Sequence, residues 1–361
     1  MYGPSQSSTY TTGVNVSLWA EIIVMKALDF SLSSEGRRRS GEIRPDEKES
    51  SLTVNGPIAV TEKPQIPVTY QQPSYIRINL WLRDAIELCA SMRGLGWDFG
   101  IGIYVPKHTR PLDRGPFVIA TLRSFIRNFL MLDFLEWLLK LFPGVGDPRG
   151  GSIFYPQLPP LQRYAVSTTI HTLSGSCLLA GFGMCYDLLT LVGVVFFHDS
   201  PNDWPPIMDD PWSSDSLHEF WAIRWHQLFR RAFTFFGGYP GQLIAGNIGA
   251  VFGTFIASGL YHECAMYGMG RGFDHRPPMF FAIQGPLLVL ERFWKMMTGR
   301  RVGGWPGRLW VYFVILVLGQ PMLDSWHTRG LGGGMVIPPV VSPVRMVLFP
   351  VVSNIVERWQ H

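Results

Sequence analysis

RAFTFFGGYPGQLIAGNIGAVFGTFIASGLYH, residues 231–262, is the stretch that decides the fold class. The thirty residues between Arg231 and His262 include no Asp, Glu, Lys, Arg or His. Because about 20 apolar residues suffice to cross a bilayer, the stretch predicts a membrane segment. Small residues recur in it at helical spacing, which predicts a smooth face that another helix can approach closely; they are Gly246, Gly249, Gly253 and Ala257.

Further apolar segments lie on both sides of this stretch. Residues 165–186 have no Asp, Glu, Lys or Arg, and their apolar pattern continues to Phe197. Other apolar segments cover residues 116–142, 279–290, 309–323 and 334–354, and residues 14–30 form a weaker candidate that carries three charges. Charged side chains inside a membrane segment must face protein, water or each other, and residues 116–142 carry four of them: Arg123, Arg127, Asp133 and Glu136. The segments predict an all-α, polytopic transmembrane helical bundle with about six to eight membrane segments.

The N-terminal region is predicted to differ from the rest of the chain. Residues 1–13 are small and polar and are expected to be disordered, and residues 31–51 are half charged, which is typical of an exposed loop. We therefore expect an N-terminal region, residues 1–74, with the weak membrane segment and the charged loop. The remainder, residues 75–361, is expected to form a membrane-embedded domain.

Composition excludes several classes of protein. Hydrophobic residues make up 47% and charged residues 16%, whereas soluble domains carry roughly 25% charged residues. The net charge is +4 and the basic residues are scattered, which argues against nucleic acid as a partner. The four cysteines show no paired spacing, and His218 and His226 share one predicted helix without a third ligand nearby. The sequence therefore predicts neither a disulfide framework nor a metal site.

SLHEFWAIRWHQLFRR, residues 216–231, combines polar and aromatic residues. Ser216 is a plausible helix N-cap and Glu219 takes the third position, as in a capping box. On a helix, Glu219, His226 and Arg230 fall along one side, away from an apolar side rich in Trp and Leu. The pattern predicts an amphipathic helix at the bilayer interface. Spacing alone leaves open whether its polar side chains simply face solvent.

SGLYHE, residues 258–263, places His262 at the end of the uncharged run. A desolvated imidazole stays neutral and can act as a base near pH 7. The alternative is that His262 only marks a helix end, where histidine is stabilised by the helix macrodipole. Glu263 is adjacent and on a helix points about 100° away, so it is a poor partner for orienting His262.

Residues 204–230, WPPIMDDPWSSDSLHEFWAIRWHQLFR, resemble the signature of the wax synthase-like branch of the membrane-bound O-acyltransferases. That signature is approximately W-P-x-[IL]-F, a short spacer, and S-L-x-x-F-W-x-x-R-W-H-Q-x-F-R. Downstream, SGLYHE matches the family's S-G-x-x-H-E. SMRGLGWDF at residues 91–99 and GQPMLDSW at residues 319–326 look like elements of the fungal members. The resemblance extends from about residue 75 to residue 330.

The resemblance implies an acyl-CoA-dependent O-acyltransferase without a bound cofactor or metal. His262 stands at the histidine that the family is thought to use in catalysis. His226 stands where the sterol and diacylglycerol acyltransferase relatives carry an asparagine near the reaction centre, so it is a second catalytic candidate. Contacts with substrate or CoA are expected from neighbouring side chains, although the arginines could instead bind anionic lipid headgroups; these residues are Arg224, Trp225, Gln227, Arg230 and Glu263.

Fungal members of this branch are mostly acetyltransferases acting on terpenoid and other secondary metabolites, and plant members make wax esters. The resemblance therefore implies transfer of an acyl group, expected to be acetyl from acetyl-CoA, to a hydroxyl of a lipophilic acceptor at the endoplasmic reticulum membrane. Long-chain wax-ester synthesis and a non-catalytic lipid-binding or transport role are the alternatives. The expected partners are the bilayer, acyl-CoA and a lipophilic alcohol, and the oligomeric state is left open. Members usually open with clean membrane helices, so the charged candidate at residues 14–30 suggests a shortened or mis-assembled N-terminus.

Overall fold

The computed structural model of the chain describes residues 20–33, 36–40, 80–268, 270–334 and 336–348. These residues are helical or irregular, and their β-pairing is limited to one antiparallel bridge between Arg39 and Trp97, which confirms the predicted all-α class. The chain divides into two compact units, Lys26–Ile103 and Met1–Met25 with Tyr104–His361. The predicted disorder of residues 1–13, most of the predicted loop at residues 31–51 and the predicted boundary after residue 74 lie outside the described residues.

In the unit Lys26–Ile103 a basic side chain holds the end of a helix. The unit contains most of a helix at residues 20–31, α3 (Leu80–Ala90) and the 3-10 helix η1 (Asp98–Gly100). The Nζ of Lys26 donates to the carbonyl oxygens of Leu88 and Cys89 at 2.9 and 2.7 Å. The last carbonyls of a helix have no partner within the helix, so Lys26 completes the hydrogen bonding at the end of α3. One of the three charged side chains in the weak membrane candidate, residues 14–30, is therefore hydrogen-bonded to backbone carbonyls of the protein.

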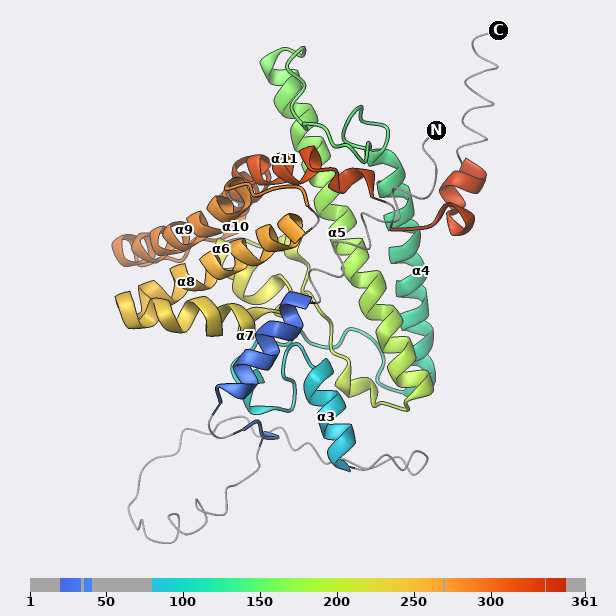
Figure 1. Cartoon of the computed structure of the whole chain (residues 1–361), viewed down its shortest axis with the longest axis vertical. Helices are drawn as coiled ribbons and strands as arrows, with labels where there is room; N and C mark the ends of the chain where they lie inside the picture. The colour runs from blue at the N-terminus through green and yellow to red at the C-terminus, as the bar shows by residue number, and fades with distance from the viewer. Residues whose placement is uncertain (1–19, 34–35, 41–79, 269, 335, 349–361) are drawn as a thin grey trace. The chain divides into compact units, whose positions relative to one another are not determined.

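In the larger unit, two long helices pack side by side (Figure 1): α4 (Arg114–Leu139) and α5 (Pro160–Phe196). The predicted apolar segment at residues 165–186 is confirmed as part of α5, whose 37 residues correspond to about 55 Å at 1.5 Å per residue. Asp187 within α5 is almost fully buried and pairs with Arg110 at 2.5 Å, while the amide nitrogen of Asn128 donates to it at 3.1 Å. The one carboxylate in the middle of α5 is thus neutralised inside the protein.

The acidic residues of α4 bind other parts of the protein, as predicted. Asp133 accepts from the hydroxyl of Ser342 and from the backbone N–H of Val344 at 2.5 and 2.9 Å. Glu136 pairs with Lys140 and Arg345 at 2.8 and 2.6 Å. These bonds anchor the C-terminal segment that contains the short helices η8 (Pro339–Val341) and η9 (Val344–Leu348) against α4.

The uncharged run between Arg231 and His262 is long and apolar enough for a membrane segment, as predicted, but it is not one straight helix. It folds as α7 (Arg230–Phe233), the π-helical η5 (Thr234–Gly238) and α8 (Tyr239–Gly268). The backbone leaves the helical region inside α8, at Ala245 (φ −139°, ψ 28°) and Gly246 (φ 58°, ψ −145°). The second of these conformations is open essentially only to glycine. The chain reverses there, and the run becomes a helical hairpin.

Two pairs of glycines hold the limbs of this hairpin together. A Cβ atom on Gly237 would overlap the carbonyl oxygen of Gly253, and a Cβ on Gly241 would overlap that of Gly249. Gly249 and Gly253 therefore form the predicted face for close helix approach, which is confirmed. The approaching element is the preceding limb of the same run, because Gly246 lies in the turn and not on the face.

Four helical segments complete the unit after α8. They are α9 (Arg276–Thr298), α10 (Gly304–Tyr312), the π-helical η6 (Phe313–Leu318) and α11 (Gln320–Thr328). α9 packs on α8 and on α11, and Pro286 lies inside α9. The remaining short 3-10 helices are η2 (Pro201–Asp203), η3 (Pro211–Ser213) and η7 (Leu331–Gly333).

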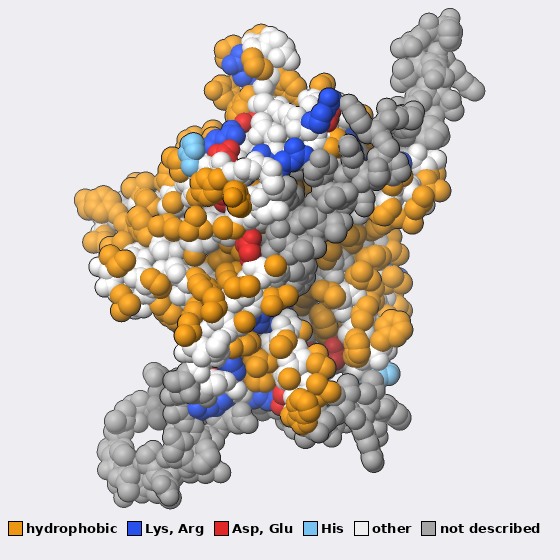
Figure 2. Space-filling model, in the orientation of Figure 1, with side chains coloured by type: hydrophobic (Ala, Val, Ile, Leu, Met, Phe, Trp, Pro, Cys, Tyr) orange, Lys and Arg blue, Asp and Glu red, His pale blue; other side chains and the backbone are white. Residues whose placement is uncertain are grey.

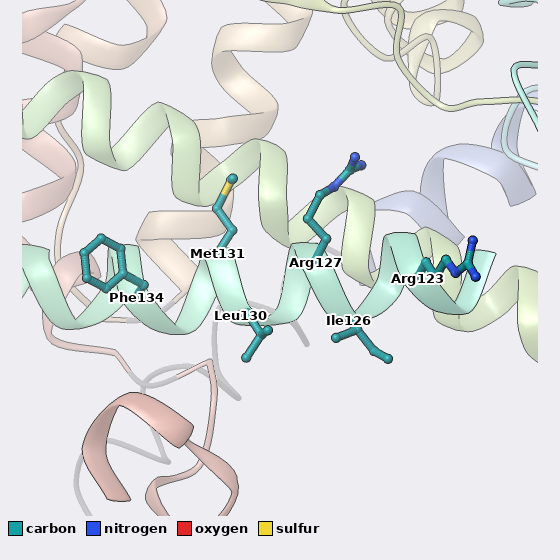
Figure 3. Close-up of a pocket in the computed structure, with 6 residues that line it drawn as sticks. All are labelled: Arg123, Ile126, Arg127, Leu130, Met131 and Phe134. Carbon is teal, nitrogen blue, oxygen red and sulfur yellow. The ribbon is translucent and has the colours of Figure 1, made fainter. Parts of the chain in front are cut away.

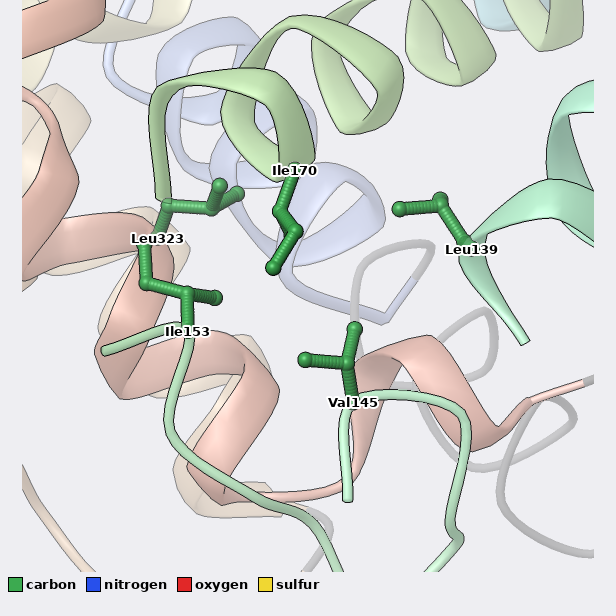
Figure 4. Close-up of a cluster of buried hydrophobic side chains, with 5 residues drawn as sticks. All are labelled: Leu139, Val145, Ile153, Ile170 and Leu323. Atoms are coloured by element: carbon green, nitrogen blue, oxygen red, sulfur yellow. The ribbon is translucent and has the colours of Figure 1, made fainter. Parts of the chain in front are cut away.

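A buried apolar cluster joins the end of α4, the first half of α11 and the first third of α5. Figure 4 shows its five side chains, Leu139, Val145, Ile153, Ile170 and Leu323, pointing toward one another from three helices and the loop between α4 and α5. Val145, Ile153 and Ile170 are completely buried. Because apolar burial of this kind contributes roughly 1.5–3 kcal/mol per side chain, the cluster fixes α11 relative to α5.

Three helical segments among the described residues are long and apolar enough to cross a membrane: Pro160–Phe196, Arg230–Gly268 and Gly304–Thr328. The second contains the hairpin turn, where Leu243 and Ile244 are 89% and 86% exposed. Apolar side chains also dominate the visible surfaces of α8, α9 and α4 (Figure 2). Exposed apolar surface on this scale is typical of contact with lipid. The protein is therefore an all-α membrane protein, and the count of six to eight segments stays a prediction.

Candidate active site

The predicted amphipathic helix at residues 216–231 is wrong as a single helix. The segment forms α6 (Leu217–Glu219) and the π-helical η4 (Phe220–Arg224), and becomes extended at Trp225 (φ −73°, ψ 150°). Ser216 caps the start as predicted, because its hydroxyl accepts from the backbone N–H of Glu219 at 3.1 Å. The carboxylate of Glu219, however, binds the N–H of Asp215 and the side chain of Arg224, both at 2.8 Å.

Contacts with α9 hold the start of this helix. The buried carboxylate of Glu291 on α9 accepts from the backbone N–H groups of Leu217 and His218 at 2.7 and 3.1 Å. It also accepts from the indole N–H of Trp310 at 3.1 Å. The first N–H groups of a helix have no partner within the helix, and bonds to a charged acceptor are stronger than neutral ones, so Glu291 fastens the start of α6 to α9.

The break after η4 turns His226 into the protein interior. Its ring lies 4.8 Å from that of Phe182 on α5 and 5.6 Å from that of Phe229, centroid to centroid. Its Nδ1 atom is buried and has no hydrogen-bond partner. Burial lowers the pKa of His226 below its usual value, and the nearby His262 lowers it further. The imidazole is therefore neutral near pH 7 and has an unused nitrogen.

His262 lies on α8 between two aromatic side chains. Its ring centroid is 4.6 Å from that of Phe281 on α9 and 6.0 Å from that of Trp326 on α11, and the indole stands perpendicular to it. The side chain is partly accessible. Within the described residues it is engaged by ring packing, which leaves its nitrogens available to a bound molecule.

The structure brings both histidines into one aromatic cluster, although 36 positions separate them in the sequence. Phe229, beside His226, lies 5.4 Å from Tyr261, and Tyr261 lies 5.3 Å from His262. Phe229 reaches the cluster because the extended backbone at Trp225 redirects the chain. The two candidates that the sequence singled out are therefore parts of a single site.

Glu263 has a different position from its neighbour His262. It is completely buried, and its two carboxylate oxygens bind the guanidinium of Arg329 at 2.7 and 2.8 Å. The backbone N–H of Asp274 donates to it at 2.6 Å. These bonds tie α8 to the loop before α9 and to the end of α11, and a contact of Glu263 with substrate stays a prediction.

The other predicted binding residues also make contacts within the protein. Arg224 pairs with Glu219 and donates to the carbonyl oxygen of Asp209 at 2.9 Å. The amide nitrogen of Gln227 donates to the carbonyl oxygens of Trp221 and Trp225 at 2.9 and 2.8 Å. Trp225 stacks on Phe220 at 5.5 Å, and Arg230 is exposed. Gln227 and Trp225 thus shape the turn that presents His226, and their binding of CoA stays a prediction.

Sequence reasoning did not single out the polar contacts that hold α11, the helix whose Trp326 packs on His262. Asp324 on α11 accepts from the hydroxyl of Ser152 at 2.6 Å and from Arg276 at 2.7 Å. Arg276 also pairs with Asp274 at 2.7 Å. Hydrogen bonds from Arg276 hold the pKa of Asp274 below its usual value against the opposing effect of burial. The only signal in the sequence was GQPMLDSW, which contains Asp324 and Trp326.

Two hollows lie elsewhere in the larger unit. The more open one is lined by Arg123, Ile126, Arg127, Leu130, Met131 and Phe134, all from α4 (Figure 3), so it is the outer surface of one helix. The other, of about 240 Å³, lies between α4, α5 and residues 204–212 and reaches α5 at Gly183. No group of three or more His, Cys, Asp or Glu side chains in the described residues is placed to hold a metal ion.

Residues 204–283 match the Membrane bound O-acyl transferase family. The matched range includes η4, both histidines and Phe281. Over these residues the chain is similar to members of this family. The aromatic cluster that contains His226 and His262 lies within the matched residues.

Curated relatives of this chain come from fungi. It is 26% identical to the O-Mevalon transferase yanI of Aspergillus niger, over 75% of this chain and 64% of that protein. It is 23% identical to the acetyltransferase ple2 of Rhodocybe pseudopiperita, over 73% and 63%, and 25% identical to the acetyltransferase sirH of Emericella nidulans, over 72% and 64%. The chain thus spans slightly less than two thirds of the length of these relatives.

Proposed function

We propose that the protein transfers an acetyl group from acetyl-CoA to a hydroxyl of a lipophilic acceptor, such as a terpenoid secondary metabolite, at the endoplasmic reticulum membrane. The observation that carries this proposal is the partly accessible His262, which lies in one aromatic cluster with His226 and makes ring contacts but no hydrogen bond through its side chain among the described residues. The family match at residues 204–283 supports the reaction class. Two of the relatives are acetyltransferases, which supports acetyl as the group transferred.

In the proposed reaction, a nitrogen of His262 accepts the proton of the acceptor hydroxyl as the hydroxyl oxygen bonds to the thioester carbon. The carbonyl π electrons move onto oxygen and give a tetrahedral oxyanion. When the carbonyl re-forms, the carbon–sulfur bond breaks and the CoA thiolate takes the proton from His262. The products are an ester and CoA, and the histidine returns to its neutral form. Proton transfer of this kind contributes about 10²–10⁴-fold to a rate.

A membrane-embedded site suits these two substrates. An apolar alcohol partitions into the bilayer, whereas CoA carries phosphates that stay in water. Exposed apolar side chains on α8 and α9 support access for the acceptor from lipid. The exposed Arg230 is the predicted residue with the greatest access to a phosphate, because Arg224 is already paired with Glu219.

The proposal is tested by supplying acetyl-CoA and palmitoyl-CoA separately to membranes from cells that express the chain. A pooled extract of lipophilic alcohols serves as acceptor, and membranes from cells without the chain serve as the control. We expect ester formation and release of free CoA with acetyl-CoA. Preference for palmitoyl-CoA would replace acetyl transfer by wax-ester synthesis, and no ester with either donor would support a lipid-binding or transport role.

His226 is expected to act on the same reaction, as a hydrogen-bond donor to the oxyanion. His226→Ala should therefore lower kcat by about 10²-fold, whereas His226→Asn should keep a larger share of the activity because an amide N–H can occupy a similar position. Initial rates at saturating acetyl-CoA, normalised to folded protein, measure both variants. Equal rates for His226→Ala and His226→Asn would show that hydrogen bonding by this side chain does not matter.

A further inference from the structure

Trp326 presents an indole N–H that is buried and has no hydrogen-bond partner. Two other indoles of the larger unit have partners: that of Trp221 donates to the side-chain oxygen of Gln284 and that of Trp310 to Glu291, each at 3.1 Å. Among the buried indole nitrogens that the structure describes, that of Trp326 is the one left over. A buried donor without a partner costs free energy, so its position calls for an explanation.

The unpaired N–H belongs to the residue that stands directly against the candidate base. The indole of Trp326 is perpendicular to the ring of His262 at 6.0 Å, and it packs against the buried cluster that contains Phe280 and Phe281. α11 is held rigidly at this point. Two residues before Trp326, Asp324 accepts from the hydroxyl of Ser152 and from the backbone N–H of Ile153. The indole is therefore fixed in place by bonds that do not use its own nitrogen.

An indole N–H can donate a hydrogen bond but cannot accept one. Its partner must therefore be an atom that accepts a hydrogen bond. The indole cannot be the group that takes up the proton of the substrate alcohol. The acyl carbonyl oxygen meets this requirement, because it gains negative charge when the hydroxyl oxygen bonds to the thioester carbon beside the base. Preorganised donors directed at such an oxygen are among the largest contributions to acyl-transfer rates.

We infer that Trp326 is a further residue of the active site, whose indole N–H donates to the carbonyl oxygen of the acyl thioester and to the oxyanion formed from it. This inference rests on the proposed function, since it names the role of a new residue in the same site. It adds no reactant: the electron pair that moves onto the oxygen returns when the carbon–sulfur bond breaks, and the indole keeps its proton throughout.

The first test compares Trp326→Phe with Trp310→Phe in the full-length protein, in membranes and after purification in detergent. Trp326→Phe is expected to lower kcat by about 10²-fold with little change in the KM for acetyl-CoA. Its melting temperature should stay unchanged or rise, because the variant removes a donor that had no partner. Trp310→Phe should do the opposite: it removes a bond to buried Glu291 and lowers the melting temperature, while kcat per folded molecule stays near the wild-type value.

A binding measurement separates this inference from the proposed function. Wild-type protein should bind acetyl-CoA about fivefold more tightly than S-ethyl-CoA, a thioether without the carbonyl oxygen, and Trp326→Phe should bind the two equally. If the wild type binds acetyl-CoA more tightly than S-ethyl-CoA but forms no ester, the hydrogen bond from Trp326 is supported and the proposed acetyl transfer is contradicted. If the wild type forms ester but does not discriminate, and kcat of Trp326→Phe is within about twofold of wild type, the role of Trp326 is overturned.

An isosteric replacement covers the case in which Trp326→Phe does not fold. Incorporation of 3-benzothienylalanine at position 326 exchanges the N–H for sulfur and keeps the shape of the bicyclic ring. The same loss of kcat and of discrimination is expected. Wild-type kcat and wild-type discrimination in this protein would show that Trp326 contributes packing alone.

Discussion

Replacing His262 by alanine is expected to lower the rate of acyl transfer by about 10²–10⁴-fold. The imidazole stands between Phe281 and Trp326 at centroid distances of 4.6 and 6.0 Å, and it makes ring contacts there, with no hydrogen bond among the described residues. Removing it therefore takes away the proposed proton acceptor without breaking a bond that supports the fold. The rate of ester formation from acetyl-CoA, divided by the amount of folded protein found by size-exclusion chromatography, measures the effect.

His218→Ala is the matched control for His262→Ala. The side chain of His218 is exposed, and the contribution of this residue to the fold is the bond from its backbone N–H to Glu291 at 3.1 Å, which alanine retains. Its turnover is expected to stay within about twofold of wild type, since exposed substitutions of this kind change little. Wild-type turnover in His262→Ala, measured beside this control, would remove His262 from the mechanism.

Arg329→Met is expected to have the largest effect on stability, a loss of about 3–5 kcal/mol in the free energy of unfolding. Glu263 is fully buried, and Arg329 binds both of its carboxylate oxygens, at 2.7 and 2.8 Å. Methionine fills much of the same space but leaves the carboxylate with the backbone N–H of Asp274 as a remaining donor. The melting temperature of the purified protein in detergent should fall steeply, and much of the protein should be lost to aggregation.

Two further variants show whether this loss comes from the buried charge. Arg149→Met removes the arginine of an ion pair with Asp147 whose arginine side chain is 76% exposed, and exposed pairs contribute little to stability. Its melting temperature should stay close to that of the wild type. The double variant Arg329→Met with Glu263→Gln should recover part of the loss, because no uncompensated charge is left inside. An Arg329→Met protein as stable as Arg149→Met would contradict a supporting role for this pair.

Local signals in the sequence predicted the parts of the site that depend on neighbouring residues. Ser216 caps a helix start as expected, because the geometry of this cap involves only the four consecutive positions from Ser216 to Glu219. The expected helix across residues 216–231 nevertheless becomes extended at Trp225. The carbonyl oxygen of Arg224 accepts there from the backbone N–H of Asp209 at 3.0 Å. Helical spacing carries no information about a partner supplied by a preceding loop.

The candidate site was predicted in part for the same reason. His226 and His262 stood out because each lies in a short motif of the family signature. Phe281, Trp326 and Arg329 did not, because their relation to His262 exists only where α8, α9 and α11 meet. Glu263 was expected to contact substrate, and its placement in a buried ion pair follows from a residue 66 positions away.

The sequence by itself determined that the protein is an α-helical membrane protein, with a segment similar to the membrane-bound O-acyltransferases. Apolar content over about 20 consecutive residues fixes whether a segment suits a bilayer, and this quantity does not depend on the partners of the segment. The tertiary structure alone decided that the run between Arg231 and His262 reverses at Gly246 and packs on itself. Apolar residues suit a straight membrane helix and a hairpin equally well, and the choice depends on contacts between glycines 8 to 16 positions apart, such as Gly241 with Gly249 and Gly237 with Gly253.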